Sequence, residues 1–211
     1  NSRACILSKV VFCALCGHVC SRKVRKSQTF VWCCRTHLQS AALCPLKPVS
    51  ETEIQQAFLS VYNKLQANQS YILQPIIDTL LQLRFLQEQA NSARQTARDD
   101  VQRLAKQRHN LTRIHTLGYI DNAQFLERSI ALDQQLREKK KFLSKRTTDN
   151  SFERVLFQTR SIQQQLGSSP PLETFDGTIF TKLVNRVQVS PTTIEFKFMN
   201  GMTLSEKRSS L

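Results

Sequence analysis

All seven cysteines of this 211-residue chain lie before residue 45, and the rest of the chain contains none. They include the motif Cys13-Ala14-Leu15-Cys16-Gly17, the run Trp32-Cys33-Cys34 and an isolated Cys44. Cysteines gathered at one end indicate a local cross-link. Such a link stabilises a segment of roughly fifty residues, which is too small to bury a sufficient core of its own.

The spacing favours a zinc site. Zinc takes four thiolate or imidazole ligands in a tetrahedron, and a Cys-x-x-Cys turn supplies two of them. We expect Cys13 and Cys16 to form this turn and Cys34 and Cys44 to complete the site, in a Cys-x2-Cys-x17-Cys-x9-Cys pattern. Buried free cysteines, which are common core residues, are the competing interpretation.

The ligand set has open alternatives. Adjacent side chains on a strand point to opposite faces, so only one of Cys33 and Cys34 can face the metal. His18 and His37 are further candidate ligands. The remaining cysteines and the tryptophan are expected to be packing residues: Cys5, Cys20 and Trp32.

The charge of the first fifty residues is one-sided. The chain has a net charge of +14, and residues 1–50 hold eight Lys or Arg and no Asp or Glu. This imbalance indicates a polyanion-binding surface, because mixed charge would serve solubility equally well. A basic hairpin or loop holds the likeliest contacts: Arg22, Lys23, Arg25 and Lys26.

The sequence also bears on the compartment. It contains no stretch of about 18 uninterrupted apolar residues, so no segment is expected to span a membrane. Ser8 and Lys9 interrupt the apolar run near the start, which is unlike a signal peptide. We therefore expect a cytoplasmic protein whose reduced thiols hold zinc. The alternative is a secreted disulfide protein, which would be purified without metal.

Local patterns predict the remaining elements of the first part. Strands are expected over 6–12 and 29–34, and irregular structure over 35–49, where Pro45 and Pro48 occur. A helix should begin at Ser50, with Glu53 completing a capping box. Pro75 marks a kink or a new helix start.

A heptad pattern beginning at Leu83 predicts a coiled coil. One seam position carries Leu83, Ala90, Ala97, Leu104 and Leu111, and the other carries Leu86, Ala93, Asp100, Gln107 and Ile114. A second seam runs Phe125, Ser129, Leu132, Leu136, Lys139 and Leu143. Gly118 fits a helix C-cap and Asp121 or Asn122 an N-cap, so residues 76–116 and 122–146 should form an antiparallel hairpin.

The end of the chain is expected to return to a mixed structure. A break is expected over 147–151, a helix over 152–166 and another over 175–186. Strands are expected over 187–189 and 193–198, with a tight turn at Asn200-Gly201. The expected fold class is therefore α+β and mostly α.

The chain resembles the C-terminal region of a large serine recombinase, or serine integrase. The residues that carry the resemblance are Cys13-Ala14-Leu15-Cys16-Gly17, Trp32-Cys33-Cys34, Cys44, Ser50-Glu51-Thr52-Glu53-Ile54, Leu117-Gly118-Tyr119-Ile120-Asp121 and Leu183-Val184-Asn185-Arg186-Val187. In that family an aromatic residue stands two places before the third zinc ligand, which selects Cys34 over Cys33.

The resemblance implies a small zinc-ribbon head with flanking helices and a long coiled-coil hairpin inserted into it. The implied domains are residues 1–74 for the first part of the zinc-ribbon domain, 75–166 for the arm with its tip near 117–122, and 167–211 for the part that completes the head. It further implies binding to attachment-site double-stranded DNA, and self-association through the arm, with a directionality factor as a further partner. The expected tip contacts are Leu117, Tyr119 and Ile120.

No Ser/His/Asp cluster, glycine-rich phosphate loop or paired-acid site is visible. We expect a non-catalytic fragment or natural product of a bacterial or phage-encoded DNA recombinase, without the family's catalytic serine domain. The histidines on the arm, His109 and His115, are expected to be solvated. The alternative function is a zinc-stapled coiled-coil interaction module that does not bind DNA.

Overall fold

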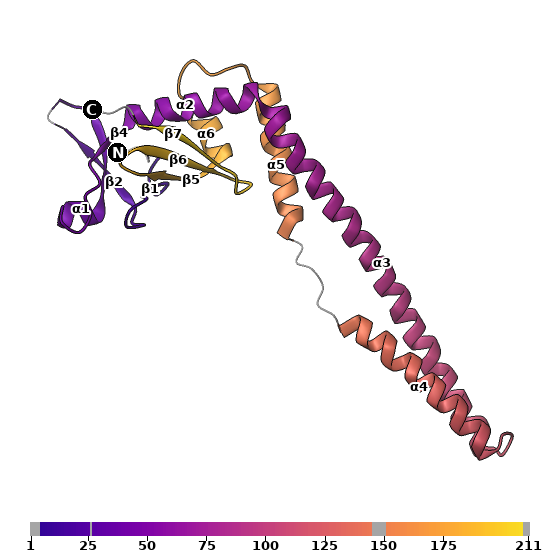
Figure 1. Ribbon diagram of the computed structural model, residues 1–211. Helices are drawn as coiled ribbons and strands as arrows, with labels where there is room; N and C mark the ends of the chain where they lie inside the picture. Colours follow the sequence, from indigo (N-terminus) through magenta and orange to yellow (C-terminus); the bar gives the residue numbers. More distant parts are fainter. Residues whose placement is uncertain (1–4, 26, 145–150, 209–211) are drawn as a thin grey trace. The chain divides into compact units, whose positions relative to one another are not determined.

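The computed structural model describes residues 5–25, 27–144 and 151–208 (Figure 1). Long helices and two small sheets confirm the predicted α+β, mostly α class. The chain divides into two compact units, the first within Asn1–Thr79 and Glu153–Leu211 and the second within Leu80–Phe152. The domain division expected from the sequence, with boundaries at 74/75 and 166/167, remains a prediction.

A three-stranded antiparallel sheet, termed here the ribbon sheet, lies in the cysteine-rich segment. It contains β2 (Cys20–Val24), β3 (Phe30–Cys34) and β4 (Val49–Ser50), in the order β2-β3-β4. Cys20 lies opposite Cys34, and Arg22 lies opposite Trp32. The strand predicted over 29–34 is confirmed, and Trp32 is buried as predicted.

Two predictions in this region are wrong. Residues 6–10 form turns rather than a strand, and only β1 (Val11–Cys13) is extended, because Lys9 has a φ of 65° that interrupts the run. The segment 35–49 is not wholly irregular, since it begins with the short helix α1 (Arg35–Gln39). Both prolines of this segment follow α1, so they do not oppose it.

A four-stranded sheet, termed here the large sheet, joins the beginning of the chain to its end. Its other strands are β5 (Val184–Val189), β6 (Thr193–Phe198) and β7 (Thr203–Lys207), in the order β1-β5-β6-β7. β1 pairs in parallel with β5, whereas the other pairs are antiparallel. The predicted strand over 193–198 is confirmed. The helix predicted over 175–186 is shorter, because α6 (Gly177–Leu183) ends where β-branched Val184 begins β5.

Helix α2 (Glu51–Ala67) packs against strands of both sheets. The predicted cap is present, since Ser50 Oγ accepts a hydrogen bond from the Glu53 amide at 3.0 Å. The Glu53 carboxylate does not complete a capping box but binds Arg208 Nε at 3.0 Å. Phe58 lies at the centre of the core, with ring centroids 5.0–6.0 Å from those of Tyr62, Phe175, Phe180 and Phe196.

The next helix begins earlier than Pro75. Asn68 ends α2, and α3 (Gln69–Thr116) starts directly after it, so Pro75 lies inside α3. Helix α5 (Ser151–Ser168) belongs to the same unit as the first turns of α3, and Gln163 donates a hydrogen bond to Gln74 at 3.2 Å. The break predicted over 147–151 lies outside the described residues, apart from Ser151.

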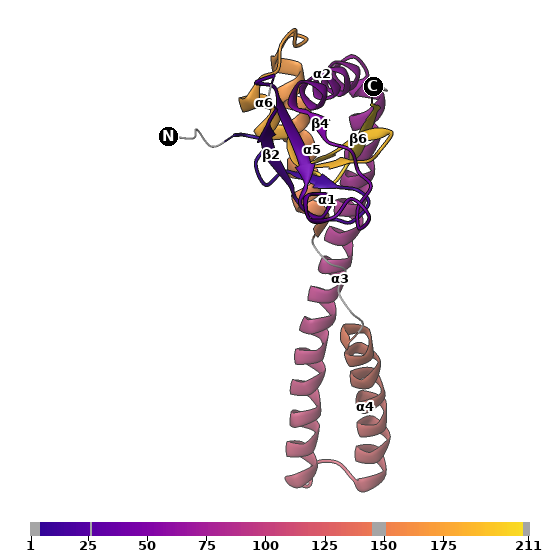
Figure 2. The ribbon, with the colours of Figure 1, turned by 90° about the vertical axis from the view of Figure 1, so that its left-hand side faces the viewer.

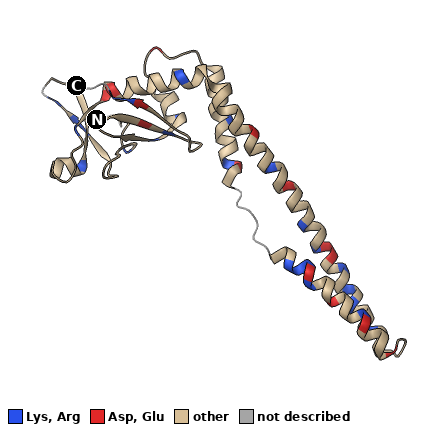
Figure 3. Cartoon of the chain, in the orientation of Figure 1, with Lys and Arg blue, Asp and Glu red and all other residues tan. Residues whose placement is uncertain are grey.

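The second unit is an antiparallel helical hairpin of α3 and α4 (Asn122–Ser144), which lie side by side in Figures 1 and 2. Arg94 donates to the carbonyl of Leu143 at 2.7 Å. Nearer the turn, ion pairs join Asp100 to Lys139 at 2.8 Å and Arg108 to Asp133 at 3.0 Å. Basic and acidic residues are interspersed along both helices (Figure 3), so cross-helix pairs reinforce the register.

Only part of the predicted α3 seam is buried against the partner helix α4. Ala97, Leu104 and Leu111 are buried, and the α4 seam residues are buried or half-buried. Leu83 and Leu86, from the same heptads, are 46% and 59% exposed. Helix α4 ends at Ser144, so within the described residues it does not reach these earlier heptads.

The turn between the helices follows the predicted caps. Gly118 has a φ of 76°, and the Tyr119 amide donates to the carbonyl of Ile114 at 3.0 Å. Asp121 Oδ1 accepts from the Gln124 amide at 2.8 Å and so caps α4. His115 is not simply solvated, because its ring stacks on Phe125 with centroids 4.2 Å apart. The prediction that His115 is solvated is therefore wrong, because its side chain is half-buried.

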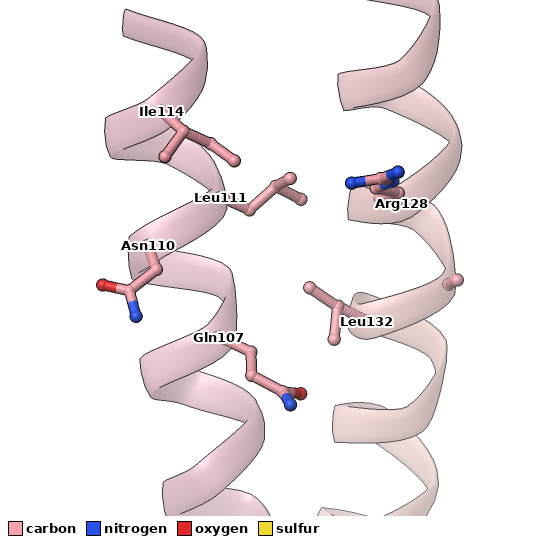
Figure 4. Close-up of a pocket in the computed structure, with 7 residues that line it drawn as sticks. Gln107, Asn110, Leu111, Ile114, Arg128 and Leu132 are labelled. Atoms are coloured by element: carbon pink, nitrogen blue, oxygen red, sulfur yellow. The ribbon is translucent and has the colours of Figure 1, made fainter. Parts of the chain in front are cut away.

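A groove of about 520 Å³ opens between α3 and α4 (Figure 4). Leu111 and Leu132 point toward each other from the facing helices, whereas Asn110 points away. Gln107 stands at a seam position but is exposed. Since a polar side chain there leaves the leucines incompletely covered, the groove is a packing gap in the hairpin.

Among the helices that the structure describes, none is long and apolar enough to cross a membrane.

Candidate metal centre

The structure brings together the four cysteines predicted to bind metal. The sulfur atoms of Cys13, Cys16, Cys34 and Cys44 all lie within 4.8 Å of one another. Cys13 Sγ is 3.5 Å from Cys44 Sγ, and Cys16 Sγ is 3.3 Å from Cys34 Sγ. A tetrahedral zinc with Zn–S bonds of about 2.3 Å separates its sulfurs by about 3.8 Å, so this donor set fits zinc in both chemistry and spacing.

The first two cysteines are positioned by a tight turn after β1. The Gly17 amide donates to the carbonyl of Cys13 at 2.9 Å, and the Cys13 amide donates to the carbonyl of His18 at 2.8 Å. Gly17 has a φ of 74°, which glycine adopts without the steric cost of a side chain. The Cys-x-x-Cys-Gly sequence therefore builds a knuckle whose two sulfurs face the same point.

The second pair comes from the two sides of α1. Cys34 ends β3 and stands at the N-cap position of α1, and Cys44 follows in the loop beyond. His37 is not part of the sulfur cluster; its Nδ1 lies 2.7 Å from the carbonyl oxygen of Cys44. Thr36 Oγ1 lies 3.5 Å from Cys16 Sγ. Helix α1 thus supports the cluster through side chains that are not ligands.

Burial shapes the protonation of the cluster. It raises the pKa of Cys13 to about 12 and also raises the pKa of Cys44. Burial acts in the same direction on Cys16, but hydrogen bonds from the Thr36 hydroxyl and the His18 backbone bring the pKa of Cys16 down to about 5. Buried thiolates need a compensating cation, which a bound metal supplies.

The other cysteines lie apart from the cluster. Cys33 is buried on the opposite face of β3 from Cys34, and burial raises its pKa. Cys20 is buried across the strand pair from Cys34, as expected for a packing residue. Cys5 is half-buried, with its sulfur 3.8 Å from Glu51 Oε2. All seven cysteines are free thiols.

Glu51 connects the ribbon sheet to α2. Its carboxylate accepts two hydrogen bonds from Arg22, at 2.6 and 2.7 Å, and one from Trp32 Nε1 at 3.1 Å. The Arg22 guanidinium also lies 3.5 Å from the centroid of the Phe30 ring. These contacts raise the pKa of Arg22, chiefly through the hydrogen bonds to Glu51. Arg22 therefore holds β2 against the start of α2.

The next two basic residues are Lys23, on the other face of β2, and Arg25, which directly follows the strand. Lys23 and Arg25 are exposed, and both are close enough to Cys33 to affect its pKa. Arg35 is also exposed and donates to Ser21 Oγ at 3.1 Å. Lys26 lies outside the described residues.

The turn of the hairpin exposes apolar side chains. Leu117 is 62% exposed and Tyr119 is 78% exposed, whereas Ile120 is half-buried. Leu126 and Ile130, one turn apart on α4, are also more than half exposed. The side chains of Leu117 and Tyr119 are therefore mostly open to solvent at the turn.

Residues 6–63 match the family model of the recombinase zinc beta ribbon domain. This segment is similar to a recombinase zinc ribbon. All four clustered cysteines lie inside the match, which confirms the predicted resemblance to a recombinase zinc ribbon over these residues.

None of the curated proteins compared with the chain matches it. A solved structure, the crystal structure of a LSR-DNA complex, is 14% identical to this chain, with a TM-score of 0.35. The alignment covers 95% of this chain and 58% of that chain. This chain therefore spans less than two thirds of that protein, and a TM-score of this size does not establish a common fold.

Thr36 and Glu51 are site residues that the sequence did not predict. The signal for Glu51 was available, because it is the first acidic residue after a long basic stretch. Thr36 has no such signal, since its position beside Cys16 depends on α1 and on the return of β3 to the knuckle.

Replacing Cys34 with Ser should abolish stoichiometric zinc binding, whereas Cys33→Ser should retain one zinc per chain. The reason is that Cys34 Sγ belongs to the four-sulfur cluster and Cys33 lies on the opposite face of β3. Zinc content of the purified variants, measured by atomic emission, checks this. Equal zinc content in the two variants would contradict the assignment.

Zinc binding at pH 7 should release protons. Metal-free Cys13, with a pKa of about 12, and Cys44, whose pKa is also raised, are protonated at this pH and must lose their protons to become ligands. Zinc affinity should consequently fall as the pH falls, and more steeply below about pH 5, where Cys16 also gains a proton. Calorimetry in buffers of different ionisation enthalpy counts the protons, and a buffer-independent heat would refute the prediction.

Proposed function

We propose that this chain is the DNA-binding and subunit-pairing region of a site-specific serine recombinase, of the integrase type found in mobile genetic elements. The proposal is carried by the overlap of the cysteine cluster with the family match. The four-sulfur cluster and the recombinase zinc ribbon match fall on the same residues, 6–63. Strand cleavage would belong to the family's catalytic serine domain, and the site of action would be the cytoplasm of a bacterial cell.

The proposed DNA surface is formed by Lys23 of β2 and by Arg25, which directly follows this strand. Both cations are exposed, and Arg22 on the opposite face already has a carboxylate partner in Glu51. Lys23 and Arg25 are thus available to contact phosphates, which position a protein on DNA without reading the sequence. Arg22 acts in this proposal through the placement of β2, and Lys26 stays a predicted contact.

Changing Lys23 and Arg25 together to Gln should weaken binding to unrelated duplexes about equally and lower the salt slope by about two, because each residue releases about one counterion. Lys182→Gln, an exposed lysine of α6 in the same unit, is the matched control and should leave the slope unchanged. Fluorescence anisotropy over a range of salt concentrations measures both quantities.

The proposed function would be contradicted if the unaltered, zinc-loaded chain had no affinity for DNA at moderate salt. It would favour the alternative, a zinc-stapled module whose hairpin binds a protein partner. The exposed apolar residues of the hairpin turn are the observation that supports this alternative.

The second part of the proposal is association between subunits through the hairpin turn. Leu117 and Tyr119 are large and mostly exposed, and Leu126 and Ile130 of α4 are also more than half exposed. Exposed apolar patches commonly mark interaction surfaces. The proposed partner is the same turn of a second subunit, with a directionality factor as a further partner.

A double variant, Leu117→Asp with Tyr119→Ala, should lose self-association on DNA but keep its helix content and its binding to a single duplex. Asp in place of an exposed leucine introduces a charge that opposes apolar contact between two copies. Leu86→Asp, a comparably exposed leucine of α3 away from the turn, is the control and should associate normally. Sedimentation velocity with and without duplex DNA is the measurement, and unchanged association of the double variant would exclude the turn.

A further inference from the structure

The large sheet has one face in the core and one face in solvent. Val187 and Val189 of β5 are buried, so Arg186 and Gln188 lie on the outer face. The same alternation places Phe12 of β1 and Lys197 of β6 on that face, between buried neighbours. This outer face was not part of the basic surface expected from the sequence.

Two cations face each other directly on this surface. Arg186 and Lys197 are register partners of β5 and β6. Like charges directly opposite each other destabilise a sheet unless something of opposite sign lies between them. Within residues 5–25, 27–144 and 151–208, neither side chain forms an ion pair.

Arg186 is held in place without satisfying its hydrogen-bonding groups. Its guanidinium lies 3.8 Å from the centroid of the Phe12 ring. Its Nε is shielded from solvent and has no hydrogen-bond partner among the described residues. A guanidinium that is oriented by a ring and lacks an acceptor is suited to receive an anionic ligand.

We propose that Arg186 and Lys197 form a phosphate-binding site on the outer face of the large sheet, and that its occupant is a backbone phosphate of DNA. Guanidinium groups bind phosphate oxygens through paired N–H donors, and Lys197 adds a second charge from the neighbouring strand. Phe12 limits the motion of Arg186, so less freedom is lost when the anion binds.

The surface also contains an acidic residue whose charge should weaken phosphate binding at the site. Glu195, the register partner of Gln188, lies on the outer face, two residues along β6 from Lys197. A carboxylate there repels phosphate, so its removal should strengthen binding. This gives the site two kinds of variant, with opposite expected effects.

The inference rests on the proposed function, because its ligand is the DNA. The test uses the full zinc-loaded chain and a random-sequence duplex, with anisotropy measured over a range of salt concentrations. Arg186→Gln and Lys197→Gln should each lower the salt slope by about one and weaken binding, and Glu195→Gln should strengthen it. Lys182→Gln should behave like the unaltered chain, and circular dichroism and zinc content should show that every variant is folded.

The outcomes separate this inference from the proposed function. If the unaltered chain does not bind the duplex, both fail. If it binds and both Arg186→Gln and Lys197→Gln match Lys182→Gln in slope, only this inference is overturned. Titration of the unaltered chain with inorganic phosphate, followed by nuclear magnetic resonance, tests for a free-phosphate site. Shifts of the Arg186 signals, together with unchanged DNA affinity in Arg186→Gln and Lys197→Gln, would assign the site to free phosphate. That result would overturn DNA as the occupant.

Discussion

The cysteine-rich part of the first unit depends on how the negative charge of four clustered sulfur atoms is compensated. Cys13, Cys16, Cys34 and Cys44 come from three separate pieces of backbone, yet their sulfurs lie within 4.8 Å of one another. As thiolates they repel, and as buried thiols they contribute only weak hydrogen bonds. Structural zinc contributes roughly 10–16 kcal/mol in small zinc-finger peptides, whereas a small core supplies about 3–5 kcal/mol. A metal bound by these four sulfurs would therefore add a large share of the folding free energy of this segment.

Three acidic residues of the first unit form ion pairs within it. Glu51 binds Arg22, Glu53 binds Arg208, and Glu206 binds Lys64. Each pair joins elements that are distant in the chain, so the acids stabilise the fold while their charges are neutralised locally. Among the described residues, several other cations of the unit form no ion pair: Lys23, Arg25, Arg186 and Lys197. The electrostatic surface toward a polyanion thus follows from how the acids are placed in the fold.

Polar residues at the hairpin seam serve a different purpose. Asp100 occupies a seam position, and Lys139 and Arg103 hold its pKa below the usual value for a carboxyl group. An ion pair inside an apolar seam costs desolvation but disfavours other alignments of the two helices. The hairpin therefore has one preferred register, which keeps Leu117 and Tyr119 at the turn rather than in a seam.

Local interactions made several features readable from the sequence. The Cys-x-x-Cys-Gly knuckle, the Ser50 cap, the turn at Gly118 and the α4 seam all depend on residues within a few positions of one another. The heptad pattern of α3 was read correctly as an amphipathic stripe. The sequence did not show which part of the stripe is buried, because burial of Leu83 and Leu86 requires a partner helix beside them.

Contacts between distant residues were decided by the tertiary structure. The pairing of β1 with β5 joins Val11 to Val187, and neither segment carries a local signal for the other. The partner of Arg22 was hidden for the same reason, because Glu51 reaches it only after β2 and α2 have packed together. The sequence by itself determined which residues can bind metal, where α2 is capped and where the hairpin turns, since these depend on short-range geometry. Only the tertiary structure brought the sulfur of Cys34 within 4.8 Å of the other three and decided which cations of the described residues lack an acidic partner, because strand pairing and charge pairing depend on neighbours far away in the chain.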